Sequence, residues 1–99
     1  MSLLLRFPKK VPVIIQKSLS CTDRHLTLPK SRYLVPKSMR VAELLFYLRY
    51  QLHVPAHVSI FIWINDKLPS LNHTMGLLFE EENINNRLYL YYGTEHTFG

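Results

Sequence analysis

The chain has 99 residues, of which 47% are hydrophobic, and this length and composition suit one compact domain with a single core. A single cysteine, Cys21, excludes an intramolecular disulfide, and no apolar run approaches the roughly 20 residues that a membrane-spanning helix needs. The net charge of +5 is uneven, because residues 1–49 hold ten Lys and Arg against two acidic residues and residues 50–99 hold two against five. The first half therefore carries a basic surface that attracts acidic partners.

Two short strands are expected first along the chain. Residues 11–15 alternate apolar faces at the period of a strand, although Pro12 argues against an interior position paired on both sides. Residues 16–31 mix polar residues, histidine and proline without a sustained period, so a connection or an irregular hairpin is expected there. Residues 33–35 form the second strand, which Pro36 ends.

A long amphipathic helix follows these strands. Ser38 is its expected N-cap residue, and Pro55 prevents the helix from continuing. The apolar residues of the helix recur at helical spacing and lie in one stripe: Val41, Leu44, Leu45, Leu48 and Leu52.

A third strand is expected at residues 59–64, which are almost all β-branched or aromatic and read as largely buried. Asn65 and Asp66 favour a turn directly after it. Residues 67–69 have room for a brief return strand.

The last elements are a short helix and a strand. Thr74 is expected to cap a helix over residues 75–82, which places three glutamates near its C-terminal end, where negative charge is unfavourable. A loop at residues 83–86 then leads to the final strand at residues 88–92.

This order of elements favours an α+β fold of the β-grasp, or ubiquitin-like, arrangement. A mixed sheet of four to five strands packs on one main helix, with a short second helix beside it, so that two layers bury each other. We expect one β-grasp domain over residues 11–93, between an N-terminal tail at residues 1–10 and a flexible C-terminal tail at residues 94–99.

Four stretches match a known pattern in the same order along the chain. They are residues 6–14 (RFPKKVPVI), residues 32–36 (RYLVP), residues 74–76 (TMG) and the closing pair Phe98 and Gly99. Together they resemble the autophagy-related ubiquitin-like modifiers of the GABARAP and microtubule-associated light-chain-three type.

The resemblance implies a protein that is conjugated through Gly99. An E1-like and an E2-like enzyme would activate and pass on this glycine, which would then be joined to phosphatidylethanolamine. A cysteine protease would process or deconjugate the protein. We expect a cytoplasmic protein that becomes membrane-bound on autophagosomes after lipidation.

The resemblance also implies that the protein binds receptor peptides with an aromatic residue, two intervening residues and an aliphatic one. By matched position, the aromatic-side pocket draws on Pro12, Ile14, Arg32 and Leu34. The aliphatic-side pocket draws on Tyr33, Val35, Pro36, Met39, Leu44, Tyr47 and Leu48. Acidic flanks of the peptide would meet Lys30, Arg32 and Arg49.

The chain departs from the family pattern in three places. Only residues 1–7 stand where the family carries a helical extension. The segment of residues 16–32 is about two residues longer than the family pattern, and the loop near residues 83–86 is about one residue shorter. At the position of an apolar pocket residue on the family's last strand stands Arg87, which would hinder a buried indole or attract an acidic group.

Other functions remain open at this point. A related modifier is joined to a lysine of a partner protein and also ends in glycine, and a basic surface with several tyrosines is compatible with nucleic-acid binding, although nucleic acid is not the expected partner.

We do not expect an enzyme, a metal site or a cofactor. Cys21 has His25 four residues on, but a flexible basic loop supplies little to activate a thiol. His53 and His57 have helical spacing, yet Pro55 between them breaks the helix that would aim both at one metal ion.

Overall fold

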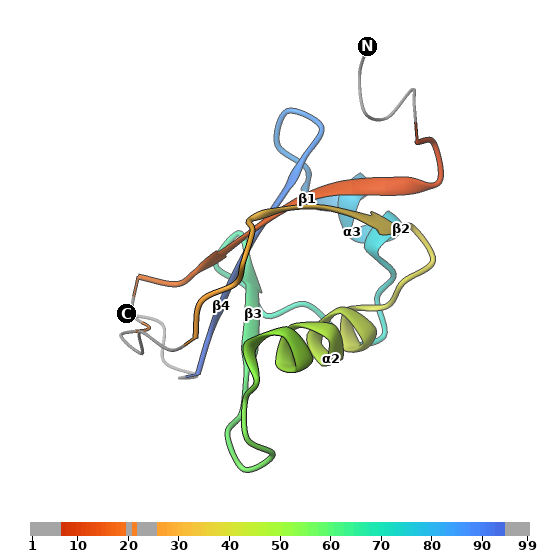
Figure 1. Cartoon of the computed structure of the whole chain (residues 1–99). Coiled ribbons are helices and arrows are strands. Elements are labelled where there is room, and N and C mark those ends of the chain that lie inside the picture. Colours follow the sequence, from red (N-terminus) through yellow and green to blue (C-terminus); the bar gives the residue numbers. More distant parts are fainter. Residues whose placement is uncertain (1–6, 20, 22–25, 95–99) are drawn as a thin grey trace.

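The computed structural model describes residues 7–19, 21 and 26–94. Four strands form one sheet in the order β2-β1-β4-β3. They are β1 (Lys10–Lys17), β2 (Arg32–Pro36), β3 (Phe61–Ile64) and β4 (Leu88–Gly93), and the helices are α2 (Val41–Leu52) and α3 (Met75–Glu82) (Figure 1). The predicted α+β fold with a mixed sheet, one main helix and a short second helix is confirmed.

The sheet is mixed because its central pair of strands is parallel. β1 runs parallel to β4, whereas β2 pairs antiparallel with β1, and β3 pairs antiparallel with β4. This order leaves β2 and β3 as the two edge strands. Each edge strand has one side on which no named strand of the described chain pairs with it.

The core lies between the sheet and α2, which crosses below the strands in Figure 1. Alternate residues of β1 and the stripe predicted on the helix meet there, and Leu48 and Val11 are fully buried. Because a fully buried leucine contributes about 1.5–3 kcal/mol relative to an exposed one, this stripe supplies much of the stability of the fold. The residues of the core cluster are Val11, Val13, Ile15, Leu26, Val35, Val41, Leu44, Leu48, Leu52, Ile60, Ile62, Ile64, Met75, Leu78, Leu88, Leu90 and Tyr92.

The start of α2 differs from the prediction. Its N-cap residue is Arg40, not Ser38, and the Glu43 carboxylate accepts a hydrogen bond from the Arg40 backbone N–H at 3.0 Å. The backbone N–H groups of Val41 and Ala42, which have no partner within a helix, donate instead to main-chain carbonyls of residues 71–73 at 2.9 and 3.0 Å. A serine cap is unnecessary here because a distant segment supplies the acceptors.

The start of α3 is capped as predicted. The Thr74 hydroxyl accepts a hydrogen bond from the Leu77 N–H at 3.2 Å. Gly76 donates its N–H to the Lys37 carbonyl at 3.0 Å, and a Cβ at Gly76 would lie 3.0 Å from the Cβ of Lys37. The close approach of two backbones explains why glycine stands in the matched TMG stretch.

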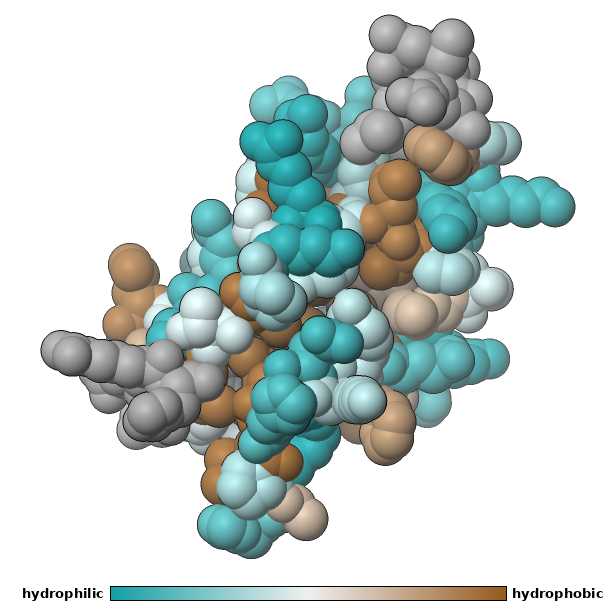
Figure 2. All heavy atoms as spheres, viewed as in Figure 1, coloured by the Kyte–Doolittle hydropathy of each residue, from teal (hydrophilic) through white to brown (hydrophobic). Residues whose placement is uncertain are grey.

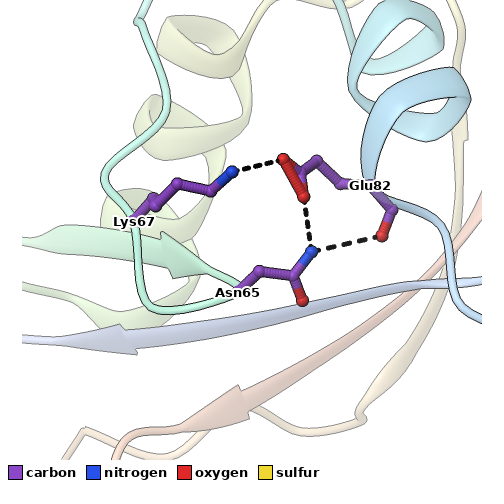
Figure 3. Close-up of polar contacts among 3 residues, drawn as sticks. All are labelled: Asn65, Lys67 and Glu82. Atoms are coloured by element: carbon purple, nitrogen blue, oxygen red, sulfur yellow. Dashed lines mark hydrogen bonds and ion pairs between the residues drawn. The ribbon is translucent and has the colours of Figure 1, made fainter.

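The acidic C-terminal end of α3 is stabilised by the turn that follows β3. Asn65 and Asp66 both have positive φ angles, as the predicted turn requires, and residues 64 and 67 exchange two hydrogen bonds across it. The brief return strand predicted at residues 67–69 is reduced to this single bridge. Lys67 donates to Glu82 at 2.7 Å and the Asn65 amide donates to the same carboxylate at 2.5 Å (Figure 3).

These contacts change the protonation behaviour of the pair. The hydrogen bond with Lys67, followed by that from Asn65, holds the pKa of Glu82 below its ordinary value, and the same contact raises the pKa of Lys67. The negative charge that is unfavourable at the end of a helix is thus compensated by a cation from a neighbouring turn.

Candidate peptide-binding edge of the sheet

The free edge of β2 is the centre of the predicted peptide site. Among the described strands, β2 pairs with β1 alone, through a register that places Tyr33 opposite Val13 and Val35 opposite Val11. The backbone groups on its other side are available to an added strand, which is how extended peptides bind sheet edges.

The four residues predicted for the aromatic side come together on the outer face of the sheet. Pro12 lies opposite Leu34, and Ile14 lies opposite Arg32, as cross-strand neighbours. Side chains alternate along a strand, so these residues point away from the core that Val11 and Val13 enter. Pro12 is buried, Ile14 and Leu34 are half-buried, and Arg32 is exposed.

The residues predicted for the aliphatic side divide into two groups. Tyr33 and Tyr47 form an edge-to-face aromatic pair between β2 and α2, with ring centroids 6.2 Å apart, and Tyr47 remains 37% exposed. Burial is the main cause that raises the pKa of Tyr33, followed by the neighbouring Tyr47 and then Tyr92. Met39 is half-buried and Pro36 is exposed, so both are accessible to a ligand.

The second group is part of the core. Leu44 and Leu48 are 1% and 0% exposed and Val35 is 6% exposed. These three side chains can form the floor below the tyrosine pair, but they offer almost no surface of their own to a peptide.

The three predicted cations also differ in their surroundings. The Lys30 ammonium lies 5.1 Å from the centre of the Tyr33 ring, and the Tyr33 hydroxyl donates to the Lys30 carbonyl at 2.9 Å. Arg32 is exposed beside them. Arg49, by contrast, donates to the carbonyls of Val58 at 2.6 Å and Pro55 at 3.0 Å, so its guanidinium is occupied by the loop after α2.

The surface in this region mixes apolar and hydrophilic side chains. Figure 2 shows brown apolar side chains breaking through a mostly teal surface on the side of the molecule that carries β2 and α2. Among the described residues, Lys67 and Glu82 form the sole ion pair, so no carboxylate in that part of the chain pairs with the cations near β2. The site therefore favours acidic ligands.

The sequence did not reveal a second apolar groove, which lies along the other edge of the sheet. It has a volume of about 250 Å³. Because β3 and β2 are the opposite edges of the sheet, this groove is separate from the tyrosine pair. Its lining residues come from α2, β3 and the segments before and after β3: Val41, Leu45, Ile60, Phe61, Ile62, Leu68, Pro69 and Leu71.

Several sequence predictions fall outside the described residues. Gly99, residues 95–98 of the C-terminal tail, residues 1–6 and His25 lie there. Cys21 is a half-buried free cysteine. Within residues 7–19, 21 and 26–94, no group of three or more His, Cys, Asp or Glu side chains is placed to hold a metal ion, and none of the helices is long and apolar enough to cross a membrane.

Comparison with known proteins identifies the family. The model of the family described as "Autophagy protein Atg8 ubiquitin like" matches residues 2–99. The chain belongs to the Atg8 family of ubiquitin-like autophagy proteins. It is 32% identical over 100 residues to autophagy-related protein 8D of Oryza sativa subsp. japonica, an alignment that covers 99% of this chain and 83% of that protein.

A solved Atg8 structure has the same fold. The crystal structure of Trypanosoma brucei ATG8 superimposes with a TM-score of 0.84 at 25% sequence identity, covering 97% of this chain and 82% of that one. The resemblance inferred from the four short stretches is thereby confirmed, and so is the ubiquitin-like fold.

Proposed function

We propose that this Atg8-family protein is conjugated through Gly99 to phosphatidylethanolamine and binds aromatic-x-x-aliphatic peptides of receptors along β2. The observation that carries the peptide-binding part is the free edge of β2, with the Tyr33–Tyr47 pair on one side and an apolar outer face on the other. A peptide added there would gain main-chain hydrogen bonds from the edge and selectivity from the two surfaces.

Each side of the edge has a distinct task. The aromatic residue of the peptide would lie on Pro12, Ile14 and Leu34, whereas the aliphatic residue would contact the tyrosine pair, Met39 and Pro36 above the buried floor. In an extended peptide, side chains three residues apart point to opposite faces. The aromatic and the aliphatic anchor would therefore contact opposite faces of the sheet, as the positions of the two groups of site residues require. Lys30 and Arg32 would attract acidic residues that flank the anchors.

The conjugation part rests on family membership. The family model extends through residue 99, and the Atg8 family consists of ubiquitin-like modifiers. Glycine can enter a narrow enzyme cleft because it has no side chain and wide backbone freedom. An E1-like and an E2-like enzyme would transfer its carboxyl group to the amine of phosphatidylethanolamine, and a cysteine protease would process or release the protein.

Conjugation would change the location of the protein. A phospholipid brings two acyl chains, and at about 0.8 kcal/mol per buried methylene two chains give stable anchoring where one gives only marginal binding. The unconjugated protein would stay in the cytoplasm, and the conjugate would stay on autophagosomal membranes.

Reconstitution tests the conjugation. The chain is incubated with the lipid-conjugating E1-like and E2-like enzymes, ATP and vesicles that contain phosphatidylethanolamine, with Gly99→Ala as the matched control. We expect a lipid adduct that forms only with Gly99 and stays with the vesicles on flotation. An adduct to protein lysines alone would contradict the proposal, as would no adduct with any acceptor together with salt-dependent binding to oligonucleotides.

Calorimetry with an aromatic-x-x-aliphatic peptide tests the edge of β2. We expect Tyr33→Ala and Tyr47→Ala each to weaken binding about tenfold, because a few buried aromatic residues carry most of the binding energy at interfaces. Leu71→Ala is the control, since Leu71 is an exposed apolar residue in the groove at the opposite edge. If Leu71→Ala weakened binding and the tyrosine variants did not, the peptide would bind along β3.

A further inference from the structure

Arg87 lies beside the aromatic-side residues on the outer face of the sheet. Leu88 and Leu90 of β4 are 0% and 2% exposed and point into the core, so alternation places Arg87 and Tyr89 on the opposite face. The parallel register pairs Ile14 with Tyr89 and begins at the pair of Val13 and Leu88, so Pro12 and Arg87 each stand one residue before its first pair.

This arrangement places a cation on each side of β1. Arg32 lies opposite Ile14 on the β2 side, and Arg87 directly precedes Leu88, the β4 partner of Val13, on the other side. Both are exposed. Neither guanidinium has a carboxylate partner within the described part of the chain, where Lys67 and Glu82 form the sole ion pair. The half-buried apolar side chains of Ile14 and Leu34, with Pro12 buried beside them, are therefore bordered by two sets of N–H donors.

The distance across the strands decides which part of a ligand meets Arg87. A peptide added to β2 is three strand spacings from β4, or about 14 Å. An aromatic side chain from that peptide would cross β2 and extend toward β1, and the long side chain of Arg87 would extend toward β1 from the other side. The far end of the aromatic ring is then the part closest to the guanidinium.

Hydrogen-bond chemistry distinguishes the three aromatic residues at this position. A guanidinium only donates, and the indole N–H of tryptophan also only donates, so the two cannot form a hydrogen bond with each other. Phenylalanine offers no polar atom. The hydroxyl oxygen of tyrosine, at the far end of its ring, can accept a hydrogen bond from a charged donor, which is stronger than one between neutral groups.

We infer that the aromatic-side pocket selects peptides whose aromatic residue is tyrosine, and that Arg87 determines this selectivity. The inference rests on the proposed binding of peptides along β2 and names the class of peptide bound there. Tyrosine should bind about fivefold tighter than phenylalanine, because a site that hydrogen-bonds a hydroxyl discriminates against the analogue that lacks it.

The test uses the full chain and three synthetic peptides that differ only in having tyrosine, phenylalanine or tryptophan as the aromatic residue. Affinities are measured by calorimetry for the wild type, for Arg87→Met and for Arg40→Met. The last variant is the control, because it removes the same charge from a residue that donates to the Asn72 carbonyl, away from the outer face.

In the wild type we expect the order tyrosine, then phenylalanine, then tryptophan. Arg87→Met should weaken the tyrosine peptide and strengthen the tryptophan peptide, so that the preference disappears or reverses, whereas Arg40→Met should leave the order unchanged. Equal affinities of the tyrosine and phenylalanine peptides, or an equal effect of Arg87→Met on all three, would overturn the inference while peptide binding itself stands. If none of the three peptides bound, the proposed peptide function would fail, and the preference with it.

Discussion

Arg49 provides the sharpest test of the site, because sequence and structure give it different tasks. The resemblance assigns it to acidic flanks of a peptide, whereas its guanidinium donates to the carbonyls of Val58, Pro55 and, at 3.5 Å, Ala56. We therefore expect Arg49→Met, which keeps the aliphatic stem, to destabilise the fold and to leave peptide binding nearly unchanged.

The magnitude follows from these bonds. A hydrogen bond from a charged group contributes about 1.5–3 kcal/mol, and since only the 2.6 Å bond to Val58 is partly buried, the loss should be about 2 kcal/mol in total. For a domain of this size, that lowers the melting temperature by roughly 10 °C. Thermal unfolding followed by circular dichroism measures it.

The matched control is Arg32→Met, at an exposed cation beside the free edge. It should leave the melting temperature unchanged and weaken a peptide with acidic flanks several-fold more than the same peptide with neutral flanks. If instead Arg49→Met had the melting temperature of the wild type and lost as much affinity for the acidic peptide as Arg32→Met, the structural role argued for Arg49 would be wrong.

Three further changes test other contacts. Tyr92→Phe removes a buried hydroxyl that donates to the Leu26 carbonyl at 2.8 Å, and it should cost about 1–2 kcal/mol in denaturant unfolding; an unchanged midpoint would contradict this. Thr74→Ala should lower the free energy of unfolding by about 0.5–1 kcal/mol, at the low end for a lost cap, because carbonyls of distant residues accept from the other free N–H groups of α3. A loss above about 2 kcal/mol would refute that account. The pKa of Glu82 is lowered in the folded chain, so the stability from its pairing with Lys67 is complete above the ordinary value of 4.5 and is lost as the pH falls through the folded value. The difference in stability between wild type and Glu82→Gln should thus stay constant from about pH 7 to pH 5 and shrink at lower pH; a difference that shrinks above pH 5 would rule this out.

The peptide site shows where a residue-by-residue assignment from a resemblance needs the structure. Leu44 and Leu48 were assigned to the aliphatic side and are almost fully buried below Tyr33 and Tyr47. Their helical periodicity correctly predicts that they face the core. It does not indicate which residues of the stripe keep enough exposed surface to contact a peptide.

Local chemistry in the sequence determined the elements of this protein. β-branched and aromatic runs specified the strands, helical spacing specified α2, and Thr74 and the Asn65–Asp66 turn specified boundaries, because each depends on residues close together in the chain. Four short matches were sufficient to identify the family.

Only the tertiary structure decided which distant groups meet. The N–H groups at the start of α2 are bound by carbonyls of residues 71–73, which made a Ser38 cap unnecessary, and Arg49 is bound by the loop after its own helix. The parallel pairing of β1 with β4 likewise places Leu88 beside Val13, and so brings the preceding residue, Arg87, toward the N-terminal part of β1. Such contacts depend on strand order and on the path of the connections, which no local window of sequence contains.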